Sequence, residues 1–404
     1  MASKSSGNIL SYVVFLSTLS VILLSLVSVI FPALIIRTVS PFETDLDPFE
    51  SGPWGPLLIS NVILFGFGIG YYKKRLPKKF SQTVEFVLNF EISKKTALII
   101  AIILLSIYIG LSVGELSLNE EEEWVDYIIL KEALKIWPFG EHEDVYVKEQ
   151  TERYVRMFLL WSSLNVFQNI KILPFVASIL LVIVTYFLTY QISQKRFAGI
   201  ISMVVLLQSY TFLRYDTIAV YENFWALFYI LSLYAVYKKW YFSPISYLLS
   251  VFTKAFAVLY FPMSIFFIYR AKIHKRRKIV IIASYGIVVA ITVGIFLAGE
   301  SIFGEIIRID FTEFLIGLTS WSYQLRFDYL MILTILPLSV GLLIRSKQGI
   351  KEADSILVLI LGGLLAGPIL VMFTDFYYIL PYRFVPLVVF FAIGIGVLFS
   401  KKQT

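Results

Sequence analysis

A run of four carboxylates, Glu120–Glu123, precedes Trp124 in a chain that is 58% hydrophobic. A carboxylate held in position can take a proton from an acceptor hydroxyl while a new bond forms. The run is therefore a candidate source of a general base, and Glu122 and Glu123 are the residues we favour. The alternative is a solvated acidic loop, which is what most runs of like charge are.

Three cations interrupt later apolar regions of the chain. Arg214 shares a short polar segment with Glu222, Lys254 divides the apolar stretch 243–269, and Arg383 follows Tyr382 at the start of the last apolar segment. Lysine and arginine bind phosphate groups, and ionisable residues at membrane depth are functional candidates. The alternatives are helix capping by Arg214 and Glu222, and ordinary interfacial roles for Lys254 and Arg383.

A divalent metal has one candidate set of oxygen ligands. The segment Glu141-His142-Glu143-Asp144, together with Glu121, could bind such an ion, with Glu121 and Asp144 as the candidate ligands. A solvated turn is the alternative. The chain has no cysteine and two histidines, which excludes disulfides, thiolate metal sites and centres built from several histidines.

The composition places these residues in a membrane protein. Charged residues make up 16% of the 404 residues and the mean hydropathy is +0.80, whereas a soluble domain has about 25% charged residues. The same composition argues against disorder and against nucleic-acid binding, despite a net charge of +7. We therefore expect an all-α polytopic protein of the plasma membrane, with its chemistry on helix ends and short loops.

The apolar segments predict about twelve membrane segments. Both flanks of 243–269 are basic, so this stretch should enter and return as a short re-entrant hairpin that turns near Thr253–Lys254. Gly363 and Gly367 have the spacing of close helix contacts. The other ten segments are 9–36, 55–72, 96–114, 172–190, 197–213, 223–237, 279–298, 328–344, 355–373 and 382–399.

The charges predict the orientation. Lysine and arginine gather between alternate segments, which places both termini in the cytoplasm, while the acidic loop 115–171 lies outside. Residues 1–95 form a transmembrane hairpin with a basic cytoplasmic loop, and residues 96–404 form the main membrane domain. All the candidate residues above then lie near the outer face, where they suit a transfer reaction from a lipid-linked phosphate.

In this order the motifs resemble the GT-C superfamily of polytopic glycosyltransferases, in its protein mannosyltransferase and aminoarabinose transferase branch. That branch opens its first outer loop with an acidic pair and an aromatic residue. Downstream apolar positions match the pair to Glu122–Glu123, whereas Trp124 matches it to Glu120–Glu121. The family pair is usually led by Asp, and this chain has only Glu.

Later family elements are similar to Arg214, to Glu222 at the start of a membrane helix, to Phe252-Thr253-Lys254 and to Arg383-Phe384-Val385-Pro386. The resemblance covers roughly residues 96–399. It implies a polyprenyl- or dolichyl-phosphate sugar as donor, and an inverting transfer on the outer face to a glycan, lipid or protein acceptor. It further implies that Lys254, Arg383 and Arg214 bind the donor phosphate, while Glu222, Trp124 and Tyr382 line the cavity.

Two other functions fit the sequence. A transporter or flippase also needs ionisable groups within a helix bundle, although its site is usually at the bilayer midplane. A non-catalytic assembly subunit could use the acidic loop as a docking surface. Neither the sugar, the acceptor nor the oligomeric state follows from the sequence.

Overall fold

The computed structural model describes residues 2–31, 55–140, 142–298, 309–373 and 381–401, and within these ranges every regular element is a helix. The N-terminal part forms α1 (Ala2–Ile30), α3 (Gly55–Tyr72), α4 (Lys78–Asn89) and α5 (Lys94–Ser112). The acidic segment forms η1 (Val113–Ser117), η2 (Glu120–Glu123), α6 (Val125–Ile136), α7 (Val145–Thr151) and α8 (Tyr154–Phe167).

The remaining chain forms the larger part of the bundle. Its elements are α9 (Ile172–Ser193), α10 (Arg196–Leu207), α11 (Tyr210–Arg214), α12 (Phe224–Lys238), α13 (Phe242–Thr253), η3 (Ala255–Tyr260), α14 (Phe261–Arg270) and α15 (Lys275–Ala298). They continue as α16 (Phe311–Tyr323), η5 (Gln324–Phe327), α17 (Tyr329–Lys347), α18 (Glu352–Phe373), η6 (Pro381–Phe384) and α19 (Val385–Val397).

Local sequence explains several helix boundaries. Ser93 begins α5, because its hydroxyl accepts a hydrogen bond from the backbone N–H of Thr96. Helices α8 and α9 end where Gln168 and Gln194 adopt left-handed backbone conformations, with φ of 56° and 58°. These two turns position the residues that follow them, Lys171 at one end of α9 and Lys195 at the other.

The fold is that of an integral membrane protein. Among the residues that the structure describes, six helices are long and apolar enough to cross a bilayer: Ile9–Ile30, Lys94–Ser117, Ile172–Ser193, Lys275–Gly294, Tyr329–Lys347 and Glu352–Phe373. The shorter apolar helices are Ile59–Tyr72, Arg196–Leu207, Phe224–Lys238, Phe242–Thr253, Ala255–Arg270 and Pro381–Val397. Each expected segment thus corresponds to a helix, but only half of these helices are long enough to span alone.

The segment 242–270 doubles back beside α12. Helix α13 runs antiparallel to α12, α14 runs parallel to it, and the chain reverses direction at Lys254 between them. The contacts that define these directions are Ser250 with Trp225 and Tyr247 with Tyr229 for α13, and Ser264 with Tyr229 and Phe267 with Tyr237 for α14.

The sequence missed helix α16, because its apolar run is short and contains several polar residues. It packs against α18 through the glycines whose spacing predicted a close contact. The Trp321 indole N–H donates to the carbonyl oxygen of Gly363 at 2.9 Å, and a Cβ on Gly367 would lie 2.3 Å from the Trp321 ring. Only glycine allows this approach.

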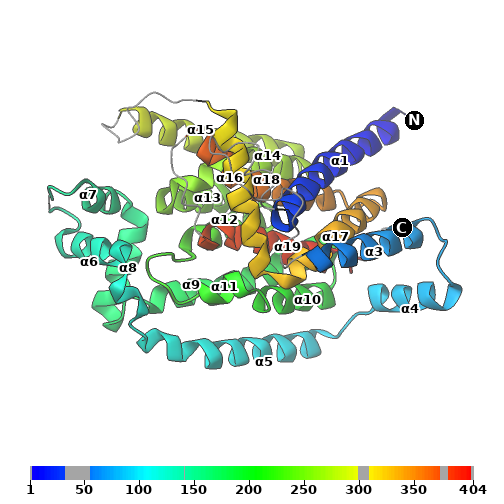
Figure 1. Ribbon diagram of the computed structural model, residues 1–404, viewed down its shortest axis with the longest axis horizontal. Coiled ribbons are helices and arrows are strands. Elements are labelled where there is room, and N and C mark those ends of the chain that lie inside the picture. The colour runs from blue at the N-terminus through cyan, green and yellow to red at the C-terminus, as the bar shows by residue number, and fades with distance from the viewer. Residues whose placement is uncertain (1, 32–54, 141, 299–308, 374–380, 402–404) are drawn as a thin grey trace, which may run out of the picture.

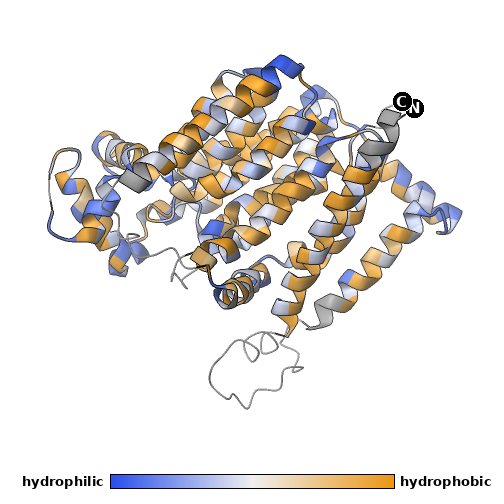
Figure 2. Cartoon of the chain, turned by 90° about the horizontal axis from the view of Figure 1, so that it is seen from above, coloured by the Kyte–Doolittle hydropathy of each residue, from blue (hydrophilic) through white to orange (hydrophobic). Residues whose placement is uncertain are grey.

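The two ends of the bundle differ in charge. Figure 1 shows α6, α7 and α8 at one end and α4 with the start of α1 at the other, and Figure 2 shows hydrophobic residues along the helices between them. We call the first end, with segments 115–136, 168–171, 209–222, 254 and 381–384, the acidic end. At the opposite, basic end, contacts join Lys195 to Phe90, Arg270 to Asp354, Lys347 to Tyr12 and Lys401 to Ser193.

Candidate functional site

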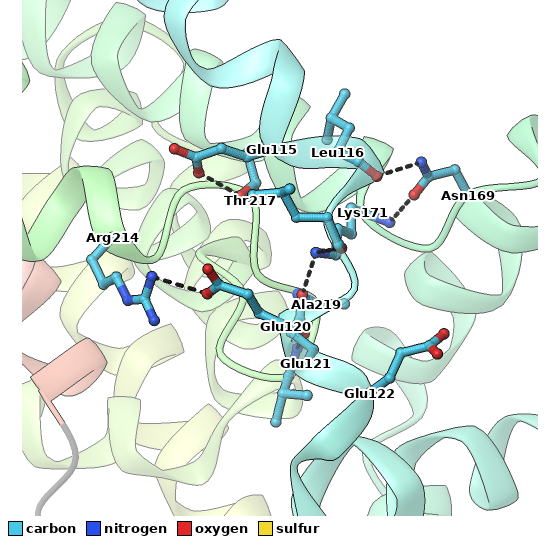
Figure 3. A network of polar contacts seen from close by, with 12 residues as sticks. Glu115, Leu116, Glu120, Glu121, Glu122, Asn169, Lys171, Arg214, Thr217 and Ala219 are labelled. Carbon is cyan, nitrogen blue, oxygen red and sulfur yellow. Dashed lines mark hydrogen bonds and ion pairs between the residues drawn. The ribbon is translucent and has the colours of Figure 1, made fainter.

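The acidic run is docked onto the bundle by one buried carboxylate. Glu121 is 1% exposed, and its Oε1 lies 3.1 Å from Lys171 Nζ. The same carboxylate accepts hydrogen bonds from the backbone N–H groups of Ala219, at 3.0 and 3.2 Å, and Val220, at 3.1 Å (Figure 3). A buried charge is tolerated when it is paired and hydrogen-bonded in this way. Glu121 therefore joins the loop before α6 to the loop before α12.

The neighbouring glutamates face different surroundings. Glu120 forms an ion pair with Arg214 at 3.2 Å, whereas Glu122 pairs with Lys131 at 3.3 Å. Figure 3 shows Glu120 directed toward Arg214 and Glu122 directed away from it. All four of these side chains are more than 40% exposed. Each ion pair therefore contributes at most about 1 kcal/mol to stability. Glu123 is exposed.

Four residues connect this loop to the start of α19. The Tyr221 ring stacks on the Tyr382 ring, with centroids 4.4 Å apart and planes at 13°. Trp124 packs against Tyr221 at 5.7 Å, and the Tyr221 hydroxyl donates to Asp126 Oδ2 at 2.7 Å. The structure thus brings together Trp124 and Tyr382, which the sequence placed in one cavity, through Tyr221.

Two cations lie against Tyr382. Lys254 Nζ is 3.9 Å from the centre of its ring, and Arg383 Nε donates to its hydroxyl at 3.3 Å. Arg383 Nη1 is buried and has no hydrogen-bond partner among the described residues. Neither cation has an ion pair with a carboxylate within the described part of the chain. Two adjacent positive groups with a free buried donor are suited to an anion.

Glu222 has a different environment from the one expected. It is 3% exposed and its Oε2 accepts from Arg156 Nε at 2.9 Å. Arg156 Nη2 also donates to the carbonyl oxygen of Val220 at 2.8 Å, and Nη1 donates to Gln150. This ion pair holds the loop before α12 against α8. The Glu222 carboxylate is therefore engaged by Arg156. This ion pair fixes the residue that directly follows Tyr221 of the aromatic stack.

A third buried carboxylate, Asp216, supports the same loop. Asp216 is fully buried and accepts a hydrogen bond from the Ser112 hydroxyl at 2.8 Å. Burial raises its pKa to about 7, although the hydrogen bonds from Ser112 and Tyr108 act in the opposite direction. The next residue, Thr217, donates to Glu115 at 3.1 Å. Asp216 and Thr217 thus link the loop that carries Tyr221 to α5 and η1, respectively.

The proposed metal ligands do not converge. Asp144 caps α7, because its carboxylate accepts from the backbone N–H groups of Tyr146 and Val147 at 2.7 and 3.4 Å. Glu121 is occupied by Lys171 and two backbone N–H groups, and Glu141 lies outside the described residues. In the ranges that the structure describes, no three His, Asp or Glu side chains form a metal-binding group.

A cavity of about 390 Å³ lies on the Glu122 side of the acidic loop. It is lined by Leu118, Glu121, Glu122, Tyr127, Lys131 and Lys171, among others. It shares no lining residue with the group formed by Tyr382, Lys254 and Arg383. The two carboxylates that flank Glu121 in sequence thus face two different regions of the acidic end.

Sequence reasoning missed four residues of this site. Asp126 lies two residues after Trp124 and Tyr221 directly precedes Glu222, but nothing in a single sequence shows that Asp126 and Tyr221 touch. Lys171 and Arg156 could have been identified from the sequence, because both are cations beside or within apolar helices. Their carboxylate partners lie 50 and 66 positions away, at Glu121 and Glu222.

Comparisons with family models, with curated proteins and with solved structures found no match to this chain.

Proposed function

We propose that this protein is a membrane glycosyltransferase that moves a sugar from a polyprenyl-phosphate donor to an acceptor hydroxyl on the outer face of the plasma membrane. The observation that carries the proposal is the pair Lys254 and Arg383. Both contact Tyr382, and Nη1 of Arg383 is buried without a hydrogen-bond partner in the described part of the chain. The order of motifs along the chain supports the same function through its resemblance to the GT-C superfamily.

The donor phosphate lies against Lys254 and Arg383. In the reaction the acceptor oxygen attacks the anomeric carbon, the bond from that carbon to the phosphate oxygen breaks, and polyprenyl phosphate leaves with the bonding electrons. Negative charge on the phosphate grows as that bond breaks. Fixed cations at this position stabilise the transition state more than the ground state, which is the condition for catalysis.

The acceptor proton goes to a carboxylate of segment 120–126. Glu122 and Glu123 are the first candidates from the resemblance. Geometry favours Asp126 and Glu120. Tyr221, the partner of Asp126, stacks on Tyr382. Arg214, the partner of Glu120, directly precedes Tyr215, whose ring packs on Tyr382. Glu122 faces Lys131 and the separate cavity. The stack of Trp124, Tyr221 and Tyr382 offers flat apolar surfaces against which a sugar ring can pack.

The membrane arrangement follows from the same proposal. The twelve apolar segments lie in the bilayer with both termini in the cytoplasm, and α13, η3 and α14 form a re-entrant pair with Lys254 at its turn. The reversal of the chain beside α12 supports this arrangement. Because Lys254 is at the acidic end with the loop 115–171, it meets the phosphate of a lipid in the outer leaflet.

The test is transfer from a labelled donor. Purified protein in nanodiscs is incubated with a radiolabelled polyprenyl-phosphate sugar. Binding of this donor and release of polyprenyl phosphate are measured separately. Lys254→Met and Arg383→Met should each lower transfer by about 10²–10³-fold. The matched control is Lys148→Gln, an exposed cation of the outer loop far in sequence from this group. Equal transfer by all variants, or a wild type that neither binds nor consumes any such donor, would falsify the proposal.

A further inference from the structure

Hydrogen bonds join the end of helix α4 to the end of α9. Its last carbonyl groups are bound by Lys195, whose Nζ lies 3.0 Å from Leu88 O and 3.4 Å from Phe90 O. Lys195 is the second residue after the end of α9, which is long enough to cross the bilayer. Glu91 adds a second link, since it accepts from the backbone N–H of Arg196 at 3.1 Å. The position of α4 along the bundle axis is therefore set by the end of α9.

None of the residues of α4 is buried, although its surface is partly apolar. Phe86 is 70% exposed, and Phe80 and Val87 are each more than 40% exposed. Phe80 and Val87 share one side of the helix, Gln82, Glu85 and Asn89 lie on the opposite side, and Phe86 lies at the edge between the two sides. The Phe80 ring lies 5.9 Å from the Phe67 ring of α3, yet Phe80 and Val87 stay more than 40% exposed. An amphipathic helix with such an apolar side needs an apolar environment from outside the chain.

The charge around α4 identifies that environment. Segment 73–95 contains seven cations and two carboxylates, and five of the cations, Lys73, Lys74, Arg75, Lys78 and Lys79, stand at or just before the start of the helix. A second copy of the chain docked by a two-fold axis would bring these like charges together. A membrane surface with acidic headgroups instead offers both an apolar layer and opposite charge.

We propose that α4 lies flat in the leaflet at the basic end of the bundle, with Phe80 and Val87 among the acyl chains and the basic cluster on acidic phospholipid headgroups. The two membrane helices on either side, α3 and α5, hold it in the interface. This inference is independent of the glycosyltransferase proposal, because it concerns the opposite end of the molecule.

Single cysteines test the proposal, since the chain contains none. Val87→Cys and Gln82→Cys are five positions apart, which places them about 140° apart around the helix. Each is labelled with an environment-sensitive fluorophore in the full-length protein, in nanodiscs of phosphatidylcholine with or without phosphatidylglycerol. We expect an acyl-chain quencher to quench the label at position 87 several-fold more than the label at position 82, and phosphatidylglycerol to increase that difference.

A charge-depleted variant separates the two parts of the proposal. Replacing Lys73, Lys74, Lys78 and Lys79 with Gln should abolish the dependence on phosphatidylglycerol, while the size-exclusion profile stays that of the parent. Equal quenching at positions 87 and 82 overturns the proposal. So does a label at position 87 that is shielded from both the lipid quencher and an aqueous quencher, because this result would indicate a protein partner.

Discussion

The ring of Tyr221 stacks on the ring of Tyr382, with a centroid separation of 4.4 Å and an interplanar angle of 13°. The contact joins two parts of the chain that are 161 positions apart, one beside the acidic run and the other beside Lys254 and Arg383. Tyr221 also donates its hydroxyl to Asp126. A carboxylate and a pair of cations are thereby placed on two sides of one aromatic stack.

Substitutions at Tyr221 should separate the two roles of this residue. Tyr221→Phe keeps the stack and removes the hydrogen bond to Asp126, so we expect nearly unchanged donor binding with slower transfer. Tyr221→Ala removes the stack as well, which costs about 0.5–1.5 kcal/mol beyond the lost apolar burial, and should also weaken donor binding. Donor affinity and the transfer rate are measured separately in nanodiscs. Equal effects of the two substitutions on affinity would contradict a role for stacking.

The buried pair of Arg156 and Glu222 should control stability. Arg156→Ala leaves Glu222 charged, buried and unpaired, so it should destabilise the fold by about 3–5 kcal/mol. The double variant Arg156→Met, Glu222→Leu removes both charges and should recover much of that loss. Thermal unfolding in detergent is the measurement. Arg153→Ala is the control, because its ion pair with Glu149 is partly exposed and should contribute little.

The elevated pKa of Asp216 gives stability a definite pH dependence. Its pKa is raised from 3.8 to about 7, so the folded state favours the neutral carboxyl group. The stabilisation from this group is present below its unfolded pKa and is lost as the pH rises through about 7. We expect Asp216→Asn to unfold at a less pH-dependent temperature than wild type when both are scanned between about pH 5 and about pH 8. If the unfolding temperatures of wild type and Asp216→Asn changed with pH to the same extent, Asp216 would not be the cause of the pH dependence.

The sequence predicted the helical membrane fold well, because apolar length and charge clusters are local signals. Apolar length alone indicated helices that could cross a membrane, and six helices of the described residues have that length and composition. It missed α16, whose 13 residues include Thr, Ser and Glu and which depends on packing against Gly363 and Gly367 of α18. Short helices that are stabilised by tertiary contacts leave no strong periodic pattern.

The sequence indicated which residues are candidates for the site, but not which residues they contact. Lys254, Tyr382 and Arg383, which come from two separate motifs, lie together. The sequence could not show which of the four consecutive glutamates is the proton acceptor, because the surroundings of each depend on residues distant in sequence. Arg214 pairs with Glu120, and Lys131 pairs with Glu122. Glu121 contacts Lys171 and the backbone of Ala219. A short 3-10 helix turns successive side chains in different directions, so adjacent residues of one type meet different environments.

The expected orientation can be mapped with introduced cysteines. We predict that an impermeant thiol reagent applied from outside labels Lys148→Cys but leaves Lys78→Cys unlabelled in intact cells, because the basic segment 73–95 should lie in the cytoplasm. Permeabilised cells, in which both positions should react, provide the control. Labelling of position 78 alone in intact cells would reverse the proposed topology and place the acidic end inside.

The identity of the proton acceptor can be decided by a matched set of amide substitutions. Glu120→Gln, Glu122→Gln, Glu123→Gln and Asp126→Asn each keep the shape of the side chain and remove its capacity to accept a proton. Loss of a general base typically lowers the rate by about 10²–10⁴-fold, so one variant should lose transfer while still binding the donor. We expect this variant to be Asp126→Asn or Glu120→Gln, since both residues lie on the Tyr382 side of the loop. Glu122→Gln serves as the control, because its side chain faces Lys131. A loss confined to Glu122→Gln or Glu123→Gln would instead assign the reaction to the opposite side of the loop and to the cavity beside Lys131.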